Sequence, residues 1–141
     1  MSPVQLSEDA RRMLAKANPA VISTVRDDGQ PVSAATWYLL RADRILVNMD
    51  HGRKRLHHIQ GDPRVSITVL DQSDWYTHLT IIGHVVETYD DIDLKDIDAL
   101  SRHYADGPYP RRDRARVSAL IEIDRLHGWG AQKNNDQATS R

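Results

Sequence analysis

The chain has 141 residues, no cysteine and a formal net charge of −1 at pH 7, and 40% of its residues are hydrophobic. This length is typical of one domain, and the lack of cysteine excludes disulfides, thiolate metal sites and a cysteine nucleophile. The near-neutral charge argues against a nucleic acid or a membrane surface as partner. We find no signal-peptide pattern and no apolar run near the roughly 20 residues of a membrane helix, so we expect a cytoplasmic protein.

The first elements predicted are a short helix and a β-hairpin. Ser7 can cap a helix that continues to Ala17, and the Asn-Pro pair that follows ends it. Strands are predicted at residues 20–26 and 31–40. The polar turn between them contains Gly29, which tolerates the positive φ that tight hairpins require.

The middle of the chain predicts two strands around a short helix and then one long strand. The strand at 45–49 precedes a helix at 53–61, and residues 65–70 alternate between apolar and polar side chains. A long strand pattern covers residues 75–88. Gly83 interrupts it, which indicates a bulge or a close approach of the backbone.

The last part predicts a helix at 90–104, a loop rich in Pro, Gly and Arg, and a strand at 116–124. Residues 131–141 are polar, and we expect them to form a disordered tail after a single domain at 1–130. The six strands are linked mainly by hairpins and show no βαβ alternation. The pattern therefore predicts a mainly β (α+β) fold with an antiparallel sheet that must close or pack to hide its edges.

Three consecutive cations, Arg53, Lys54 and Arg55, stand at the start of the predicted helix and directly after a strand. The N-terminus of a helix offers free amides and a positive dipole, and Lys and Arg add full charges. This arrangement suits a phosphate group. It is also compatible with a basic turn that only faces solvent.

Aromatic and polar residues form a second group that could contact a flat heterocycle. Its members are Trp37, Tyr38, Asn48, Met49, Trp75, Tyr76 and the segment His127-Gly128-Trp129-Gly130. The alternative is that Trp37 or Tyr38 belongs to the core and that Trp129 closes the barrel.

The sequence shows no recognisable catalytic constellation. Its seven histidines lack the helical i, i+4 spacing of metal ligands, and His78 and His84 would lie about 20 Å apart along a strand, so we expect no metal. There is no nucleophile elbow and no glycine-rich phosphate loop. We assign no catalytic residue, which fits a protein that relies on the chemistry of a bound cofactor.

Three segments together carry a resemblance to a known family. They are residues 20–31, 52–66 and 117–130, the last ending in His-Gly-Trp-Gly. In this order they resemble the pyridoxamine 5'-phosphate oxidase-like proteins over residues 6–130, and the last segment resembles the actinobacterial branch that uses the deazaflavin coenzyme F420.

The resemblance implies a six-stranded antiparallel split β-barrel of the FMN-binding type, and a homodimer with cofactor sites at its interface. Lys54 and Arg55 match the basic pair that holds the cofactor phosphate, with Arg53 beside them. The resemblance also implies further cofactor-binding positions that line or flank the ring: Trp37, Tyr38, Asn48 and Met49. Tyr76 and Trp129 are matched as residues that reach the site from the partner subunit.

The resemblance favours F420 over FMN. FMN-binding members carry a Ser or Thr hydroxyl just before the basic pair, where this chain has Gly52 and Arg53. F420 has a phosphodiester and an acidic tail, which the arginines at 111, 112 and 114 could reach if they do not simply face solvent. The implied reaction is hydride transfer from reduced F420 to a small quinone, enone or tetrapyrrole. The alternatives are an FMN-dependent oxidase or reductase and a non-catalytic flavin- or haem-binding protein.

Overall fold

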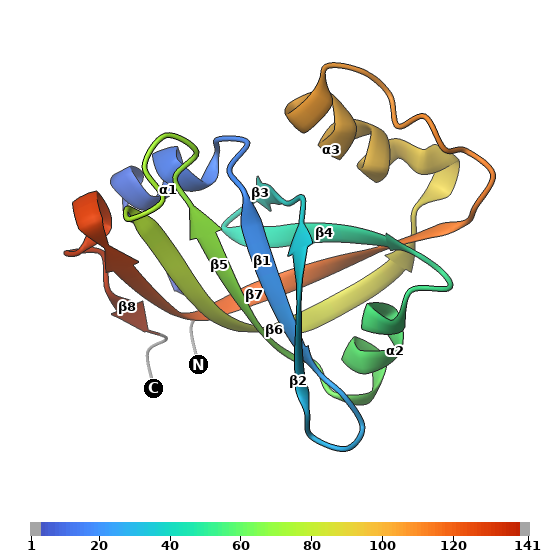
Figure 1. The fold of residues 1–141 in the computed structure, drawn as a ribbon, viewed down its shortest axis with the longest axis horizontal. Coiled ribbons are helices and arrows are strands. Elements are labelled where there is room, and N and C mark those ends of the chain that lie inside the picture. Colours follow the sequence, from blue (N-terminus) through green and yellow to red (C-terminus); the bar gives the residue numbers. More distant parts are fainter. Residues whose placement is uncertain (1–3, 139–141) are drawn as a thin grey trace.

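The computed structural model describes residues 4–138, which form one antiparallel sheet that curls into a barrel, with short helices around it (Figure 1). Along the sheet the strands follow the order β2-β1-β5-β6-β7-β4-β3, and a short β8 pairs with β7. The strands are β1 (Ala20–Val25), β2 (Pro31–Thr36), β3 (Leu39–Arg41), β4 (Arg44–Asp50), β5 (Arg64–Leu70), β6 (His78–Asp90), β7 (Arg116–Trp129) and β8 (Gln137–Ala138). The expected mainly β, antiparallel fold with short helices is confirmed.

Three α-helices and two short 3₁₀ turns accompany the sheet. They are α1 (Glu8–Leu14), α2 (Lys54–Gly61), α3 (Lys95–Ala105), η1 (Ile92–Leu94) and η2 (Gly130–Gln132). Ser7 caps α1 as predicted, since its hydroxyl accepts a hydrogen bond from the amide of Ala10 at 3.1 Å. In the described part of the chain, no helix has both the length and the apolar character needed to cross a membrane.

The predicted count of six strands is wrong, because the structure has seven in the main path and β8 besides. The segment predicted as one strand at 31–40 breaks at Trp37 and Tyr38 into β2 and β3. β2 pairs with β1 and β3 pairs with β4, so the chain crosses from one end of the sheet to the other at this break. A sequence pattern of apolar residues cannot show such a change of pairing partner.

The polar C-terminal segment is also more ordered than expected. Residues 131–138 contain part of η2 and all of β8, which pairs with Arg125 and Leu126 of β7. The Asn135 side chain forms hydrogen bonds with Ser7 and Asp9 near the other end of the chain. Polar composition predicted disorder, but here polar side chains find partners in the fold. Residues 139–141 of the expected tail lie outside the described residues.

Alternation along the strands places one set of apolar side chains inside the barrel. This buried core includes Ile22, Tyr38, Ile45, Val47, Met49, Ile67, Leu79, Ile81, Ala119, Ile121 and Ile123. On the opposite face of β4 and β7, Asn48 donates to Asp91 just before α3, and Ser118 donates to Asp96 in the first turn of α3. The two faces of β4 therefore have different roles, and only the face that bears Asn48 can take part in a site outside the barrel.

The bulge predicted at Gly83 is present, and it demands a glycine. The register between β6 and β7 shifts between Ile82 and Gly83. A Cβ on Gly83 would lie 2.3 Å from the carbonyl oxygen of Glu122, which belongs to the backbone of the paired strand. Only a residue without a side chain allows the two strands to come this close.

We expect Gly83→Ala to lower the free energy of unfolding by about 1–3 kcal/mol, because the added methyl group forces β6 and β7 apart. Chemical denaturation followed by circular dichroism measures this change. Gly107→Ala is the matched control, since nothing lies within 4 Å of its added Cβ. Equal stability of the two variants would contradict the close approach at Gly83.

Candidate functional site

A cavity of about 630 Å³ lies outside the barrel core, between the sheet, the start of α2 and α3. Its lining comes from six regions that are far apart in the sequence. The lining residues are Ala17, Pro19, Ala20, Ala35, Thr36, Trp37, Asn48, Arg53, Arg55, Gln72, Ile97, Leu100, Tyr104, Tyr109 and Arg116. The set combines aromatic and aliphatic side chains with three arginines and has no carboxylate.

The arginines of the cavity create an excess of positive charge. Among residues 4–138, no carboxylate forms a salt bridge with Arg53, Arg55 or Arg116. The Nε atom of Arg55 is buried and has no hydrogen-bond partner within the described chain. Burial, together with the charges of Arg53 and Arg116, lowers the pKa of the Arg55 guanidinium to about 10. A partly buried cation in this state is stabilised by an anion, and residues 4–138 supply no salt-bridge partner to Arg55.

The start of α2 adds to this positive potential. Arg53 is the N-cap residue, and its side chain makes no capping hydrogen bond, so the first amides of the helix lack a side-chain acceptor. The first turn of α2 has no acidic residue. Free amides, the helix dipole and arginine side chains together form an arrangement that binds phosphate groups.

Three aromatic rings line the cavity beside the arginines. Trp37 stacks on Tyr104 with ring centroids 5.3 Å apart and planes 8° apart, and Tyr109 meets Trp37 edge to face at 6.3 Å. The guanidinium of Arg116 lies over the Tyr109 ring, 4.9 Å from its centroid. Flat, rigid side chains next to cations suit a ligand that has both a planar ring system and an anionic group.

A series of hydrogen bonds between polar side chains fixes Arg116 in this cavity. The Asn48 side-chain oxygen accepts a hydrogen bond from Arg116 Nε at 2.6 Å, and its amide group donates to Asp91 at 3.1 Å and to Ser118 at 3.0 Å. Asp91 in turn accepts from two backbone amides at the start of α3, those of Asp96 and Ile97. The position of α3 and the position of Arg116 are therefore linked through one buried asparagine.

The loop after α3 carries Tyr109 over the cavity. The Asp98 carboxylate accepts two hydrogen bonds from Arg112, at 2.8 and 3.0 Å, and one from the amide of Tyr109 at 3.0 Å. These contacts lower the pKa of Asp98, with the bonds from Arg112 as the largest cause. Arg112, one of the arginines considered for an acidic tail, instead holds the loop to α3.

Two further cavities adjoin the first and share its arginines. One, of about 590 Å³, is lined by Arg26, Lys54, Arg55 and His58 among others. The other, of about 480 Å³, is lined by Asp50, Gly52, Arg53, Lys54, Arg111 and Arg114. The basic residues at 53–55 therefore lie where three hollows meet, and Arg111 and Arg114 extend the positive surface away from the aromatic rings.

The structure brings together four of the nine residues that the sequence assigned to a cofactor: Trp37, Asn48, Arg53 and Arg55 line the main cavity. Lys54 lines the two adjoining cavities. Tyr38 and Met49 are buried in the barrel core and do not line the main cavity. Strand alternation explains the difference between Asn48 and Met49, because neighbouring side chains point to opposite faces.

Tyr76 and Trp129 do not line the cavity of their own chain, and they are 63% and 54% exposed. Trp129 stacks on His78 at the surface, with ring centroids 6.1 Å apart. A contribution of Tyr76 or Trp129 to the site of a partner subunit stays a prediction.

Sequence reasoning missed three important lining residues: Tyr104, Tyr109 and Arg116. Tyr104 is the last residue of the helix predicted at 90–104, and its phenol packs against the core. Tyr109 lies in a loop with no regular pattern. Arg116 begins a strand, and only the pairing of β4 with β7 brings it close to Asn48. No spacing in the sequence signals these contacts.

The profile of one protein family, described as pyridoxamine 5'-phosphate oxidase, matches residues 6–130 of the chain. No curated protein matches significantly. Among solved structures, an F420 reductase is 24% identical with a TM-score of 0.76, and the match covers 82% of this chain and 94% of the other. A conserved hypothetical protein from Mycobacterium tuberculosis is 19% identical with a TM-score of 0.69, covering 100% and 95%. A heme binding protein from Mycobacterium smegmatis is 19% identical with a TM-score of 0.65, covering 94% and 57%.

Proposed function

The chain belongs to the pyridoxamine 5'-phosphate oxidase family, and on that premise we propose that it is an oxidoreductase that binds a flavin-type cofactor, the deazaflavin F420, in its aromatic cavity. The observation that carries the proposal is the partly buried guanidinium of Arg55, whose buried Nε has no partner in the described chain and which shares a cavity with Trp37, Tyr104 and Tyr109. Such a cofactor has an anionic group, which a guanidinium can bind, and a planar ring system, which aromatic side chains can contact.

The residues present fit the anionic part of the cofactor. Arg55 and Arg53 would hold its phosphodiester together with the free amides at the start of α2, and Arg116 would add a third cation. Lys54, Arg111 and Arg114 line the adjoining hollow and suit the acidic tail that F420 has and FMN lacks. The position before the basic pair holds Arg53 rather than a hydroxyl residue, which also favours F420 over FMN.

The aromatic residues of the cavity also fit the planar ring system of the cofactor. Trp37 and Tyr104 form a stacked pair that presents a flat apolar surface, and Tyr109 closes one side. Reduced F420 supplies hydride chemistry when it is bound. The chain itself orients the ring, excludes water with aromatic side chains, and leaves space in the cavity for a small acceptor such as a quinone, an enone or a tetrapyrrole. The proton that accompanies the hydride would come from solvent or from a nearby tyrosine or histidine.

We also infer a homodimer, with the cofactor sites near its interface. β2 is exposed along nearly its whole length, and Val21 and Val32 on neighbouring strands are each 37% exposed, so this edge of the sheet leaves apolar surface uncovered in a single chain. Light scattering after size-exclusion chromatography measures the mass. A monomer over the whole micromolar range would contradict this inference.

A side-by-side titration of the purified protein with F420, FMN and FAD tests the cofactor. We expect F420 fluorescence to be quenched with a Kd in the low micromolar range or below, and FMN and FAD to bind at least about tenfold more weakly because they lack the acidic tail. Tighter binding of FMN would replace the F420 proposal with an FMN-dependent flavoprotein. A Soret band on adding haem, without binding of either flavin type, would instead identify a non-catalytic haem-binding protein.

A further inference from the structure

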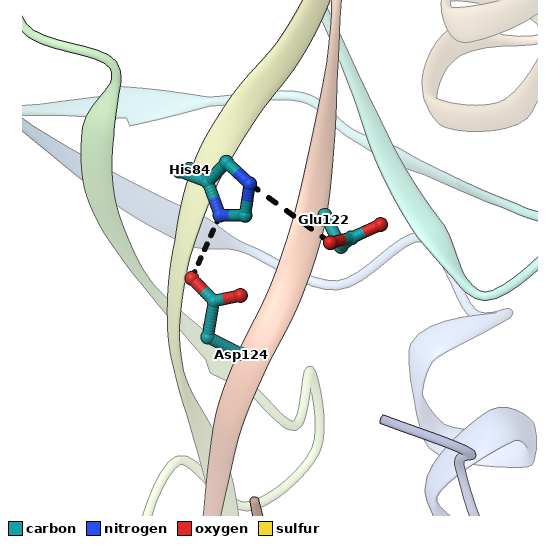
Figure 2. Close-up of side chains that lie close together, drawn as sticks. All are labelled: His84, Glu122 and Asp124. Carbon is teal, nitrogen blue, oxygen red and sulfur yellow. Dashed lines mark hydrogen bonds and ion pairs between the residues drawn. The ribbon is translucent and has the colours of Figure 1, made fainter. Parts of the chain in front are cut away.

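A histidine and two carboxylates lie together on the outer face of the sheet, away from the cavity described above (Figure 2). His84 comes from β6, and Glu122 and Asp124 come from the neighbouring β7. One ligand atom from each of the three residues lies within 4.8 Å of the others, and all three side chains are partly exposed. The proposed function uses none of them.

The local fold of β6 and β7 assembles this group. His84 is the direct cross-strand partner of Glu122. The bulge then skips one residue of β7, since Ile82 pairs with Arg125 and Gly83 pairs with Ile123. Asp124 is the residue without a partner, and the bulge brings its carboxylate nearer to His84 than a regular ladder would. The glycine that permits the bulge is thus also the residue next to the histidine.

The hydrogen bonds of His84 leave one ring nitrogen available. Asp124 lies 2.8 Å from Nδ1, and because a carboxylate only accepts, Nδ1 carries the proton. In the neutral imidazole the lone pair then lies on Nε2, which faces a Glu122 oxygen at 3.9 Å, and Figure 2 marks this contact. This distance is too long for a hydrogen bond. Two metal–ligand bonds of about 2.0–2.2 Å each can span it, so the separation suits two ligands of one ion.

Two arginines on neighbouring strands lie near this group. Arg44 of β4 approaches the other Glu122 oxygen, Oε1, at 3.6 Å. Arg64 of β5 is the cross-strand neighbour of His84, but its guanidinium is engaged in two hydrogen bonds with Asp62, at 3.0 and 2.7 Å. Among the described residues, Arg44 is thus the one arginine that forms a salt bridge with either carboxylate of the group.

We propose that His84 Nε2 and the Glu122 carboxylate bind a divalent transition-metal ion such as Zn²⁺, with water in its remaining positions. Asp124 acts as a positioning residue that holds the imidazole through Nδ1, an arrangement that recurs behind metal-bound histidines. Imidazole with carboxylate oxygen is a donor set that suits Zn²⁺ better than Mg²⁺ or Ca²⁺. The proposal is independent of the cofactor, because neither ligand lines the cavity.

Calorimetric titration of metal-free protein with ZnCl₂ tests the site. We expect one saturable ion per chain at micromolar concentrations, and Glu122→Gln and His84→Ala should each weaken binding about tenfold or more. Asp124→Ala should weaken it similarly while leaving both ligands in place. Arg44→Gln should strengthen it several-fold, because it removes the competing cation from Glu122.

His57→Ala is the matched control, since His57 is an exposed histidine that contacts a single carboxylate, Asp27, at 3.1 Å. Its Zn²⁺ affinity should equal that of the wild type. Glu122→Gln keeps the size of the side chain, and thermal melting shows whether each variant is folded. Absence of saturable binding by the wild type, or equal affinity of the wild type and Glu122→Gln, would overturn the proposal.

Discussion

Arg55→Met is expected to lower the affinity for F420 about a hundredfold or more, while the cofactor-free protein becomes more stable. The affinity falls because a guanidinium can donate two charge-assisted hydrogen bonds to the cofactor phosphate, each worth about 1.5–3 kcal/mol. Stability rises because the fold no longer desolvates a partly buried cation whose Nε has no partner in the described chain. Methionine keeps the apolar packing of the arginine stem.

The opposite signs of these two effects make the prediction specific. We expect the free energy of unfolding of the cofactor-free variant to increase by about 1–2 kcal/mol, which corresponds to a Tm a few degrees higher. Fluorescence quenching of F420 measures the affinity, and calorimetry measures the melting. A variant that binds F420 like the wild type would remove the basis of the phosphate assignment.

Lys54→Met provides the control for this experiment. Lys54 precedes Arg55 and has the same charge, but it is exposed and lines the adjoining hollows rather than the main cavity. Its replacement should leave the Tm unchanged and weaken F420 binding by only about tenfold or less, as one screened charge contributes little. Equal effects of both substitutions would mean that burial of Arg55 does not matter.

Asn48→Ala is expected to lower the free energy of unfolding by about 2–4 kcal/mol and to weaken F420 binding about tenfold. The stability falls because Asp91 and Ser118 lose a buried hydrogen-bond partner. The affinity falls because Arg116 loses the acceptor that fixes its Nε at 2.6 Å. Denaturation and F420 titration at low temperature measure the two effects separately.

Asn134 supplies the control, since it is exposed and Asn134→Ala removes the same kind of side-chain amide from the surface. That variant should match the wild type in both measurements. If Asn48→Ala kept full affinity, Arg116 would not depend on Asn48 for its position. If it kept full stability, the hydrogen bonds that link α3 to the cavity through Asn48 would not contribute to the stability of the fold.

The hairpins and the basic helix could be predicted from the sequence because their signals are local. Ser7, Gly29 and Gly83 each impose a conformation through their own backbone or side chain, and the structure shows the cap at Ser7, the positive φ of Gly29 and the bulge at Gly83. The break between β2 and β3 could not be predicted, because the two halves look alike in pattern and differ only in their pairing partner. The polar segment 131–138 was misjudged for a similar reason, since its partners lie at the other end of the chain.

The sequence alone determined a mainly β domain with a cationic helix start at residues 53–55, because periodicity and charge act between near neighbours. It also determined the family, through three motifs in order. Only the tertiary structure decided which of these residues meet. It buried Tyr38 and Met49 in the core, placed Arg116 and Tyr109 in the cavity that Arg55 lines, and brought Asp124 to His84. Such contacts depend on strand pairing and register over long separations, and no local property of the chain encodes them.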